Sequence, residues 1–294
     1  MSCDRTRWVT SVSTAFFVLL WASGAIFSRL GLDHASAFAF LVMRFALAMS
    51  VLALVGACRG RWLPSPGTRL RVALTGLLLI GGYSSCYFLA LEQGITPGVL
   101  ATVLGVQPIA TLVLMERRFP LRRVAGLGLA LCGLILVVYQ SIGLARLSAT
   151  GMLVAVLALG SATTGAILQK GIAQSPMEVL PLQYGVSIVL CSVLAWFQPF
   201  HADGGIALAI PLVWLGLVIS VIAQLLLYRL IRAGNLVNVT SLFYLVPAAT
   251  AAMDYVFLGN RLPLPSLAGM VAILLGVALV FRTGRPKRAD ARAG

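Results

Sequence analysis

Apolar residues run in long stretches along this chain, and the few charged residues divide them. Nine intervals without Asp, Glu, Lys or Arg are each at least twenty residues long: 8–28, 72–91, 93–115, 124–145, 147–169, 179–202, 204–228, 233–253 and 262–281. An α-helix rises about 1.5 Å per residue, so about twenty residues cross a hydrocarbon layer about 30 Å thick. Each interval therefore predicts one membrane-spanning helix.

A tenth apolar stretch carries one charge in its interior. Residues 37–57 read AFAFLVMRFALAMSVLALVGA, with Arg44 as the only charged residue. Continuous apolar runs of this length favour helices over the alternating strands of about ten residues that build membrane β-barrels. The pattern predicts an all-α polytopic membrane protein with ten transmembrane helices.

The chain also repeats itself. GVLATVLGVQPIAT around Pro108 matches NVTSLFYLVPAAT around Pro247 at an offset of 139 residues. FPLRRVAGLGLALCG around Gly126 matches LPLPSLAGMVAILLG around Gly269 at an offset of 143 residues. The difference between the offsets is about one helical turn. The fourth span is therefore predicted to be one turn shorter than the ninth.

Two halves of five spans each follow from this repeat. WASGAIFSR at 21–29 pairs with ATTGAILQK at 162–170, which extends the match to the start of each half. An odd number of spans per half turns the second half upside down, so we expect two inverted five-helix repeats related by a pseudo-twofold axis in the membrane plane. We place the first repeat at 8–140, the second at 148–282 and a basic cytoplasmic tail at 283–294.

Composition and charge agree with a membrane protein. Hydrophobic residues make up 60% of the chain and charged residues 10%, against about a quarter charged in soluble domains. With a cytoplasmic N-terminus, 18 of the 22 Lys and Arg lie in cytoplasmic segments, three lie outside and Arg44 lies in the membrane. The positive-inside rule then puts both termini in the cytoplasm of a bacterial inner membrane. The net charge of +14 reflects this topology and implies contact with the lipid bilayer, not with nucleic acid.

Several motifs resemble the EamA-type transporters of the drug/metabolite transporter superfamily (DMT superfamily). They are WASGAIFSRLGL and FLVMRFALA in the first half, and LLLYRLIRAGNLVNVTSLFYLVPAATAAMDYVFLGNRL in the second. Their order and spacing cover the chain from about residue 13 to residue 281. The sequence departs from the family at Asn260, where the turn after the ninth span usually carries an acid. Glu116 lies near the equivalent turn after the fourth span.

The resemblance implies an inner-membrane permease that exports amino acids, related metabolites or amphipathic toxic compounds. The residues alone support a weaker version, because an inverted repeat with polar residues in its helices is what alternating access requires. Two alternatives remain open at this point. One is a polytopic membrane scaffold or sensor without a transport cycle, and the other is an intramembrane enzyme.

Aromatic, amide and hydroxyl side chains occur in the spans that the resemblance assigns to a cavity. Such walls suit an amphipathic small molecule. Tyr83 and Tyr87 share a helix face by their i,i+4 spacing. The repeat sets Gln224 against Ser85 on another face, so not all candidates line one cavity, and each could instead form an interhelical hydrogen bond. The candidate substrate-binding residues are Trp21, Tyr83, Tyr87, Gln107, Thr163, Gln224, Asn238 and Tyr244.

Three further polar residues within spans are candidates for structural ties or coupling sites: Arg44, Gln183 and Asp254. A charge at a helix centre costs about 2.5–3.5 kcal/mol, so Arg44 is expected to face the protein, and the repeat sets Gln183 opposite it. Arg44 either binds an anionic substrate group or ties helices together, and we expect the tie. Asp254 either couples protons or pairs structurally with the interface, Arg44 or Arg261.

Catalytic, metal and cofactor motifs are not expected in this sequence. His34 and His201 fall in predicted loops, and the five cysteines are scattered. The fifth and tenth spans contain almost nothing polar apart from small residues. Small residues let helices approach closely, so these spans are predicted to form a scaffold or a homodimer contact. The small residues are Gly126, Ala130 and Gly133 against Gly269, Ala272 and Gly276.

Overall fold

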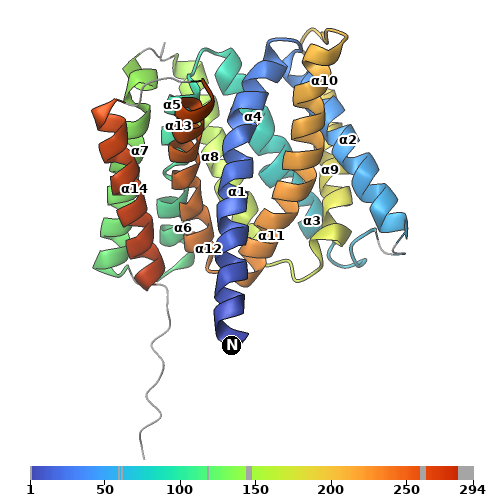
Figure 1. Cartoon of the computed structure of the whole chain (residues 1–294). Coiled ribbons are helices and arrows are strands. Elements are labelled where there is room, and N and C mark those ends of the chain that lie inside the picture. Colours follow the sequence, from blue (N-terminus) through green and yellow to red (C-terminus); the bar gives the residue numbers. More distant parts are fainter. Residues whose placement is uncertain are drawn as a thin grey trace, which may run out of the picture.

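The computed structural model is a bundle of helices that lie side by side (Figure 1). It describes residues 2–58, 60, 62–117, 119–143, 148–258 and 263–283, without the side chains of 2–13, 140–143, 254, 256–258 and 283. Within these residues, ten helices are long and apolar enough to cross a membrane, which confirms the predicted number of spans. The predicted tail at 283–294 lies outside the described residues except for the backbone of Thr283.

Six spans are single helices, and four consist of several segments. The single helices are α1 (Ser2–Leu32), α2 (Ala37–Cys58), α7 (Leu121–Gly143), α8 (Ala149–Lys170), α9 (Pro176–Ala195) and α14 (Leu264–Thr283), which form spans 1, 2, 5, 6, 7 and 10. Span 3 comprises α3 (Arg69–Gly76), the π-helix η1 (Leu77–Gly82) and α4 (Tyr83–Glu92), and span 4 comprises α5 (Pro97–Leu104) and α6 (Gln107–Met115). Span 8 comprises α10 (Ile206–Val213), the π-helix η2 (Trp214–Ala223) and α11 (Gln224–Ala233), and span 9 comprises α12 (Leu236–Ser241), the 3-10 turn η3 (Leu242–Tyr244) and α13 (Leu245–Leu258).

Equivalent caps begin spans 4 and 9. The Thr96 side chain accepts the N–H of Val99 at the start of α5, and Asn235 accepts the N–H of Val237 at the start of α12. Thr96 and Asn235 are 139 residues apart, so the sequence offset holds at these helix starts. The helices of span 9 extend from 236 to 258 and those of span 4 from 97 to 115, which confirms that span 4 is one turn shorter.

The two halves of the chain pack into each other. Span 1 packs against spans 8 and 9 of the second half, and span 6 packs against spans 3 and 4 of the first. Span 2 packs against span 7, and span 5 against span 10. Exchanging the two halves converts the contacts of span 1 into those of span 6. The same exchange converts the pair of spans 2 and 7, and the pair of spans 5 and 10, into themselves. This exchange is what a pseudo-twofold axis between inverted repeats requires.

The bundle has two distinct ends. One end, the lower end in Figure 1, is where the odd-numbered spans begin and the even-numbered spans end. We call it the basic end because most Lys and Arg adjoin it. At the opposite end, Ala35 forms an isolated β-bridge with Ala202. His201 Nε2 lies 3.0 Å from Asp203 Oδ1, and His34 Nδ1 lies 3.5 Å from Asp203 Oδ2. These contacts tie the link between spans 1 and 2 to the link between spans 7 and 8.

Spans 5 and 10 cross in direct backbone contact. A Cβ atom on Gly269 would lie 2.5 Å from the carbonyl oxygen of Gly133, and one on Gly276 would lie 2.5 Å from that of Gly126. The pairing runs in opposite directions along α7 and α14, so the two equivalent helices are antiparallel, which confirms the inverted repeat. The small residues predicted to form a scaffold or a dimer contact are thus used within one chain.

Because the crossing leaves no room for a side chain, Gly269→Ala is expected to destabilise the folded protein. Overpacking of this kind costs about 1–3 kcal/mol, and thermal unfolding in detergent, followed by size-exclusion chromatography, measures it. Gly128→Ala is the matched control on α7, because a Cβ there would meet no atom within 4 Å. Loss of an oligomer with unchanged thermal stability would instead show that these small residues form a contact between copies of the chain.

Candidate functional site

Four spans depart from regular α-helix at repeat-equivalent points. The π-helices η1 and η2 lie in spans 3 and 8, and spans 4 and 9 are interrupted just before Pro108 and Pro247. π-helical segments occur often at functional sites, and discontinuous spans often form the binding sites of inverted-repeat transporters. The irregular segments in the middle of these four spans are therefore the candidate substrate pathway.

The guanidinium of Arg44 lies between spans 2 and 8. Its Nε donates to the Oγ of Ser220 in η2 at 2.8 Å, and its Cζ lies 5.7 Å from the ring centre of Phe45. Tyr83 and Tyr87 of α4 are close enough to interact electrostatically with its charge, and their own rings are 5.8 Å apart. Arg44 thus faces neighbouring spans, and a serine hydroxyl accepts its Nε hydrogen bond.

Trp21 belongs to a second aromatic group. Its ring packs edge-on against Phe243 of η3, with centres 5.3 Å apart, and lies 5.2 Å from Phe17. Two residues further along α1, Ser23 accepts a hydrogen bond from Trp214 Nε1 at 2.9 Å. This group joins span 1 to spans 8 and 9 at the irregular segments η2 and η3.

Gln183 lies in a buried chain of polar groups. Tyr228 Oη donates to Gln183 Oε1 at 2.7 Å, and Gln183 Nε2 donates to Gln169 Oε1 at 3.0 Å. The chain links spans 6, 7 and 8 in the half of the bundle near the basic end. Gln183 and its repeat equivalent Arg44 both bond to span 8, so the pseudo-symmetry of their positions does not extend to their partners.

The other candidates divide between different surroundings. Gln107, Thr163 and Gln224 are buried, and the hydroxyl of Thr163 has no hydrogen-bond partner among the described residues. A buried polar atom without a partner costs about 1–3 kcal/mol, which makes Thr163 a candidate for contact with water or substrate. Tyr244 lies in a separate apolar cluster between spans 4, 5, 9 and 10, and Asp254 is in α13 with its side chain outside the described residues.

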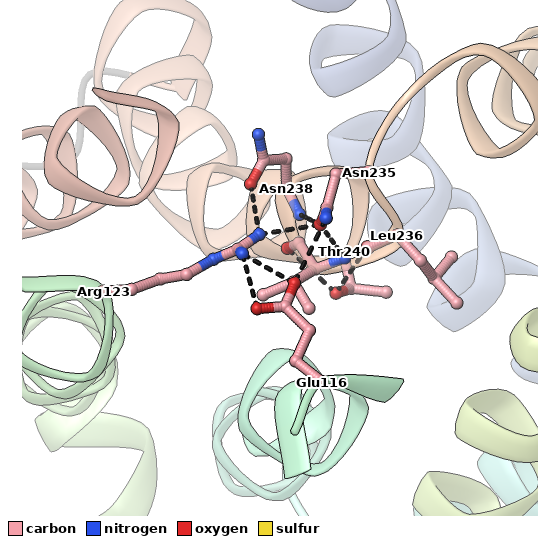
Figure 2. A network of polar contacts seen from close by, with 7 residues as sticks. Glu116, Arg123, Asn235, Leu236, Asn238 and Thr240 are labelled. Carbon is pink, nitrogen blue, oxygen red and sulfur yellow. Dashed lines mark hydrogen bonds and ion pairs between the residues drawn. The ribbon is translucent and has the colours of Figure 1, made fainter. Parts of the chain in front are cut away.

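A polar cluster at the basic end was not anticipated from the sequence. Arg123, only 4% exposed, donates from Nη1 to both carboxylate oxygens of Glu116 at 2.6 and 2.7 Å. Its Nη2 donates to Oδ1 of Asn235 and Oδ1 of Asn238, each at 2.7 Å (Figure 2). Asn235 Nδ2 also donates to Glu116 Oε1 at 3.1 Å. We call these four residues the basic-end clamp.

The basic-end clamp joins the two halves of the chain. Glu116 and Arg123 flank the turn between spans 4 and 5, whereas Asn235 and Asn238 begin span 9. Asn238, a candidate for the cavity by sequence, thus contributes its side-chain oxygen to this clamp. The repeat equivalent of Arg123 is Ser266, whose hydroxyl donates to the Val137 carbonyl at 3.2 Å. No charged side chain therefore stands at the equivalent position of the opposite end.

Helix packing shows the same difference between the ends. At the basic end α12 packs against α6 and α8, whereas in the described residues α5 does not pack comparably against α13 or α1 at the opposite end. A Cβ on Gly165, near the basic end of span 6, would lie 2.7 Å from Leu79 Cα. The nearest atom to a Cβ on its equivalent Gly24 would be Ile219 Cγ1, at 3.8 Å. Among the described residues, α12 thus has contacts at the basic end that its equivalent α5 lacks at the opposite end.

The opposite end is also hollowed. A depression of about 420 Å³ there is lined by the end of span 1 and its following link, by Glu92 at the end of span 3, and by Gln198, Pro199 and His201. The Glu92 carboxylate accepts the N–H of Ala37 at 3.2 Å on its rim. The clamp and the packing of α12 thus distinguish the basic end, whereas the links that meet at the opposite end surround this surface depression.

Known proteins resemble this chain in both sequence and fold. The EamA-like transporter family matches residues 10–139 and 149–282, one match in each half. The "Uncharacterized transporter YvbV" of Bacillus subtilis (strain 168) is 24% identical over 98% of this chain and 95% of that protein. A solved structure titled "Crystal structure of protein" shares the fold with a TM-score of 0.79, at 20% identity over 93% of this chain and 96% of that one. The chain therefore belongs to the EamA-like transporter family and is a multi-pass membrane transporter.

Proposed function

We propose that this transporter is a secondary carrier of the bacterial inner membrane that works by alternating access. The observation that carries the proposal is the unequal packing of equivalent helix ends. Exchanging the two halves of an inverted repeat would close the opposite end and open the basic end. The structure thus contains the contacts that close one end. The repeat-equivalent residues at the opposite end would form the contacts of the second closed state.

The basic end is proposed to face the cytoplasm. Arg69, Arg71, Arg117 and Arg122 are exposed at this end, and Arg29 is the exposed basic residue of the described opposite end. Basic residues near span ends are retained on the cytoplasmic side during insertion. In this orientation the structure corresponds to a state closed towards the cytoplasm and open towards the outside.

An amphipathic small molecule is the proposed cargo, exported in the manner that the family resemblance implies. Amino acids, related metabolites and amphipathic toxic compounds share an apolar part and a polar group. Trp21 with Phe243 and Tyr83 with Tyr87 supply aromatic surface near the broken spans. Aromatic faces bind apolar and cationic groups alike.

Counterflow of labelled solutes in proteoliposomes tests transport directly, and Trp21→Ala and Tyr83→Ala test the pathway. Losing an aromatic contact worth about 1 kcal/mol lowers affinity about fivefold. We therefore expect each variant to reduce counterflow or reorder substrate preference while remaining folded. Trp196→Ala is the matched control, because Trp196 is 88% exposed.

Two outcomes would contradict this proposal at different levels. If the parental protein gives no counterflow with amino acids or amphiphiles although it exchanges conformations, a scaffold or sensor function would replace transport. If transport occurs but both alanine variants match the parental rate for every solute, the pathway does not involve these aromatic groups.

Arg44 is proposed to be a structural tie between span 2 and η2. A hydrogen bond from a charged donor contributes about 1.5–3 kcal/mol, so Arg44→Ala is expected to lower thermal stability and yield in detergent. Ser220→Ala, which removes the accepting hydroxyl, should reproduce part of the loss. Normal stability of Arg44→Ala combined with selective loss of an anionic substrate would assign Arg44 to substrate binding instead.

Reporter fusions test the proposed orientation. Fusions after Arg69 and after Arg288 are expected to report the cytoplasm, because the basic residues there resist translocation. A fusion near Asp203 is expected to report the periplasm. Paired alkaline phosphatase and green fluorescent protein reporters distinguish the two sides. The reverse pattern at Arg69 and Asp203 would invert the whole bundle and make the open end cytoplasmic.

A further inference from the structure

Lys170, the last residue of α8, holds the end of span 8 at the basic end. Its Nζ donates to the carbonyl oxygens of Ile231 at 2.7 Å, Arg232 at 3.1 Å and Gly234 at 2.6 Å. Carbonyls at a helix C-terminus lack intrahelical partners and carry partial negative charge. One cation therefore caps span 8 and fixes it to span 6.

Arg29 is the repeat equivalent of Lys170, and its side chain is placed differently. It is 64% exposed and lies 3.6 Å from the Asp33 carboxylate, which is also exposed. An exposed pair of this kind contributes little to stability. The cation that should cap the end of span 3 by symmetry is therefore held only loosely, on its own helix.

The acceptors that symmetry assigns to Arg29 are present at the end of span 3. With the offset of 139 residues, the three carbonyls that Lys170 contacts correspond to those of Glu92, Gln93 and Ile95. The Gln93 carbonyl accepts a bond of 3.3 Å from Ser148 Oγ. Glu92 adds a carboxylate, which has no counterpart at Ile231.

The end of α1 already lies beside these acceptors. Leu32, three residues after Arg29, packs against the apolar cluster that contains Ala90, Leu91 and Ile95. For the guanidinium to reach the carbonyls, span 1 would approach span 3 and the Arg29 side chain would change its rotamer. Span 6 and span 8 already pack together in the equivalent arrangement at the basic end, where α8 contacts α11.

We infer that Arg29 and Lys170 are alternating latches of the transport cycle. In the state described, Lys170 caps span 8 and keeps the basic end closed. In the opposite state Lys170 releases these carbonyls, and Arg29 leaves Asp33 to cap the end of span 3 and close the opposite end. This inference rests on the proposed alternating-access function and names the contacts that exchange in it.

Distances between spin labels on the full-length protein in nanodiscs test the latches without any substrate. Native cysteines are replaced, and labels are placed at Ala173 and Ala233 across the basic end and at Leu30 and Gln93 across the opposite end, all four exposed. Lys170→Met is expected to raise the population open at the basic end at least about tenfold, because it removes all three hydrogen bonds from a charged donor. Arg229→Met is the control for removing a basic residue of span 8.

Arg29 is tested in the opposite direction. Adding Arg29→Met to Lys170→Met should reduce the population open at the basic end, because that state has lost its own latch. Asp33→Asn should raise the same population in the parental protein but not together with Arg29→Met. Both side chains are exposed, so these variants test the latch even if Lys170→Met fails to fold.

Either of two results would overturn the inference. One is an unchanged basic-end distance distribution in folded Lys170→Met. The other is insensitivity of the open population to both Arg29→Met and Asp33→Asn. Counterflow is measured separately, so a protein whose distances shift as expected but which carries no solute would contradict the proposed function and leave the latches intact.

Discussion

The antiparallel crossing of α7 and α14 is the contact from which the rest of the arrangement follows. Lipid tails are as apolar as leucine, so close packing, not the hydrophobic effect, holds helices together within the bilayer. Gly126 meets Gly276 and Gly133 meets Gly269, with backbone against backbone. In the repeat, Gly126 corresponds to Gly269 and Gly133 corresponds to Gly276. Exchanging the two halves therefore converts one of these glycine contacts into the other. The crossing therefore fixes the pseudo-twofold relation between the halves.

Inverted symmetry makes the two ends alike only where the side chains are alike. Arg123 is replaced by Ser266 at the equivalent position, and the loosely paired Arg29 stands opposite the firmly bonded Lys170. In the proposed transport cycle, opening the basic end would separate the buried Arg123 from carboxylate and amide oxygens. Separating a buried charge from its partner is strongly unfavourable unless water or another group replaces it. The difference between the two ends therefore arises from side chains that differ at repeat-equivalent positions, not from the backbone fold.

Sequence reasoning predicted what depends on local pattern. The ten spans, the inversion and the shorter span 4 followed from apolar length and from the two offsets, because a membrane imposes length directly. The π-helices, the clamp and the neighbours of each candidate did not follow. Helices that are apolar all round do not reveal which face meets the centre. Tyr83 and Tyr87 share surroundings with Arg44, whereas Tyr244 lies in another cluster and Asn238 in the clamp.

Arg123 shows why charge counting alone missed the clamp. It belongs to the run that contains Arg117 and Arg122, and every arginine in that run adds equally to the positive-inside signal. Only burial separates them, because Arg117 and Arg122 are exposed while Arg123 is bonded to both halves of the chain. Lys170 is likewise both a basic residue at a span end and the cap of span 8. The residues that carry the positive-inside signal thus also form contacts between helices at the basic end. In the proposed orientation, the same asymmetry of charge that sets the topology would also distinguish the two ends of a pseudo-symmetric backbone.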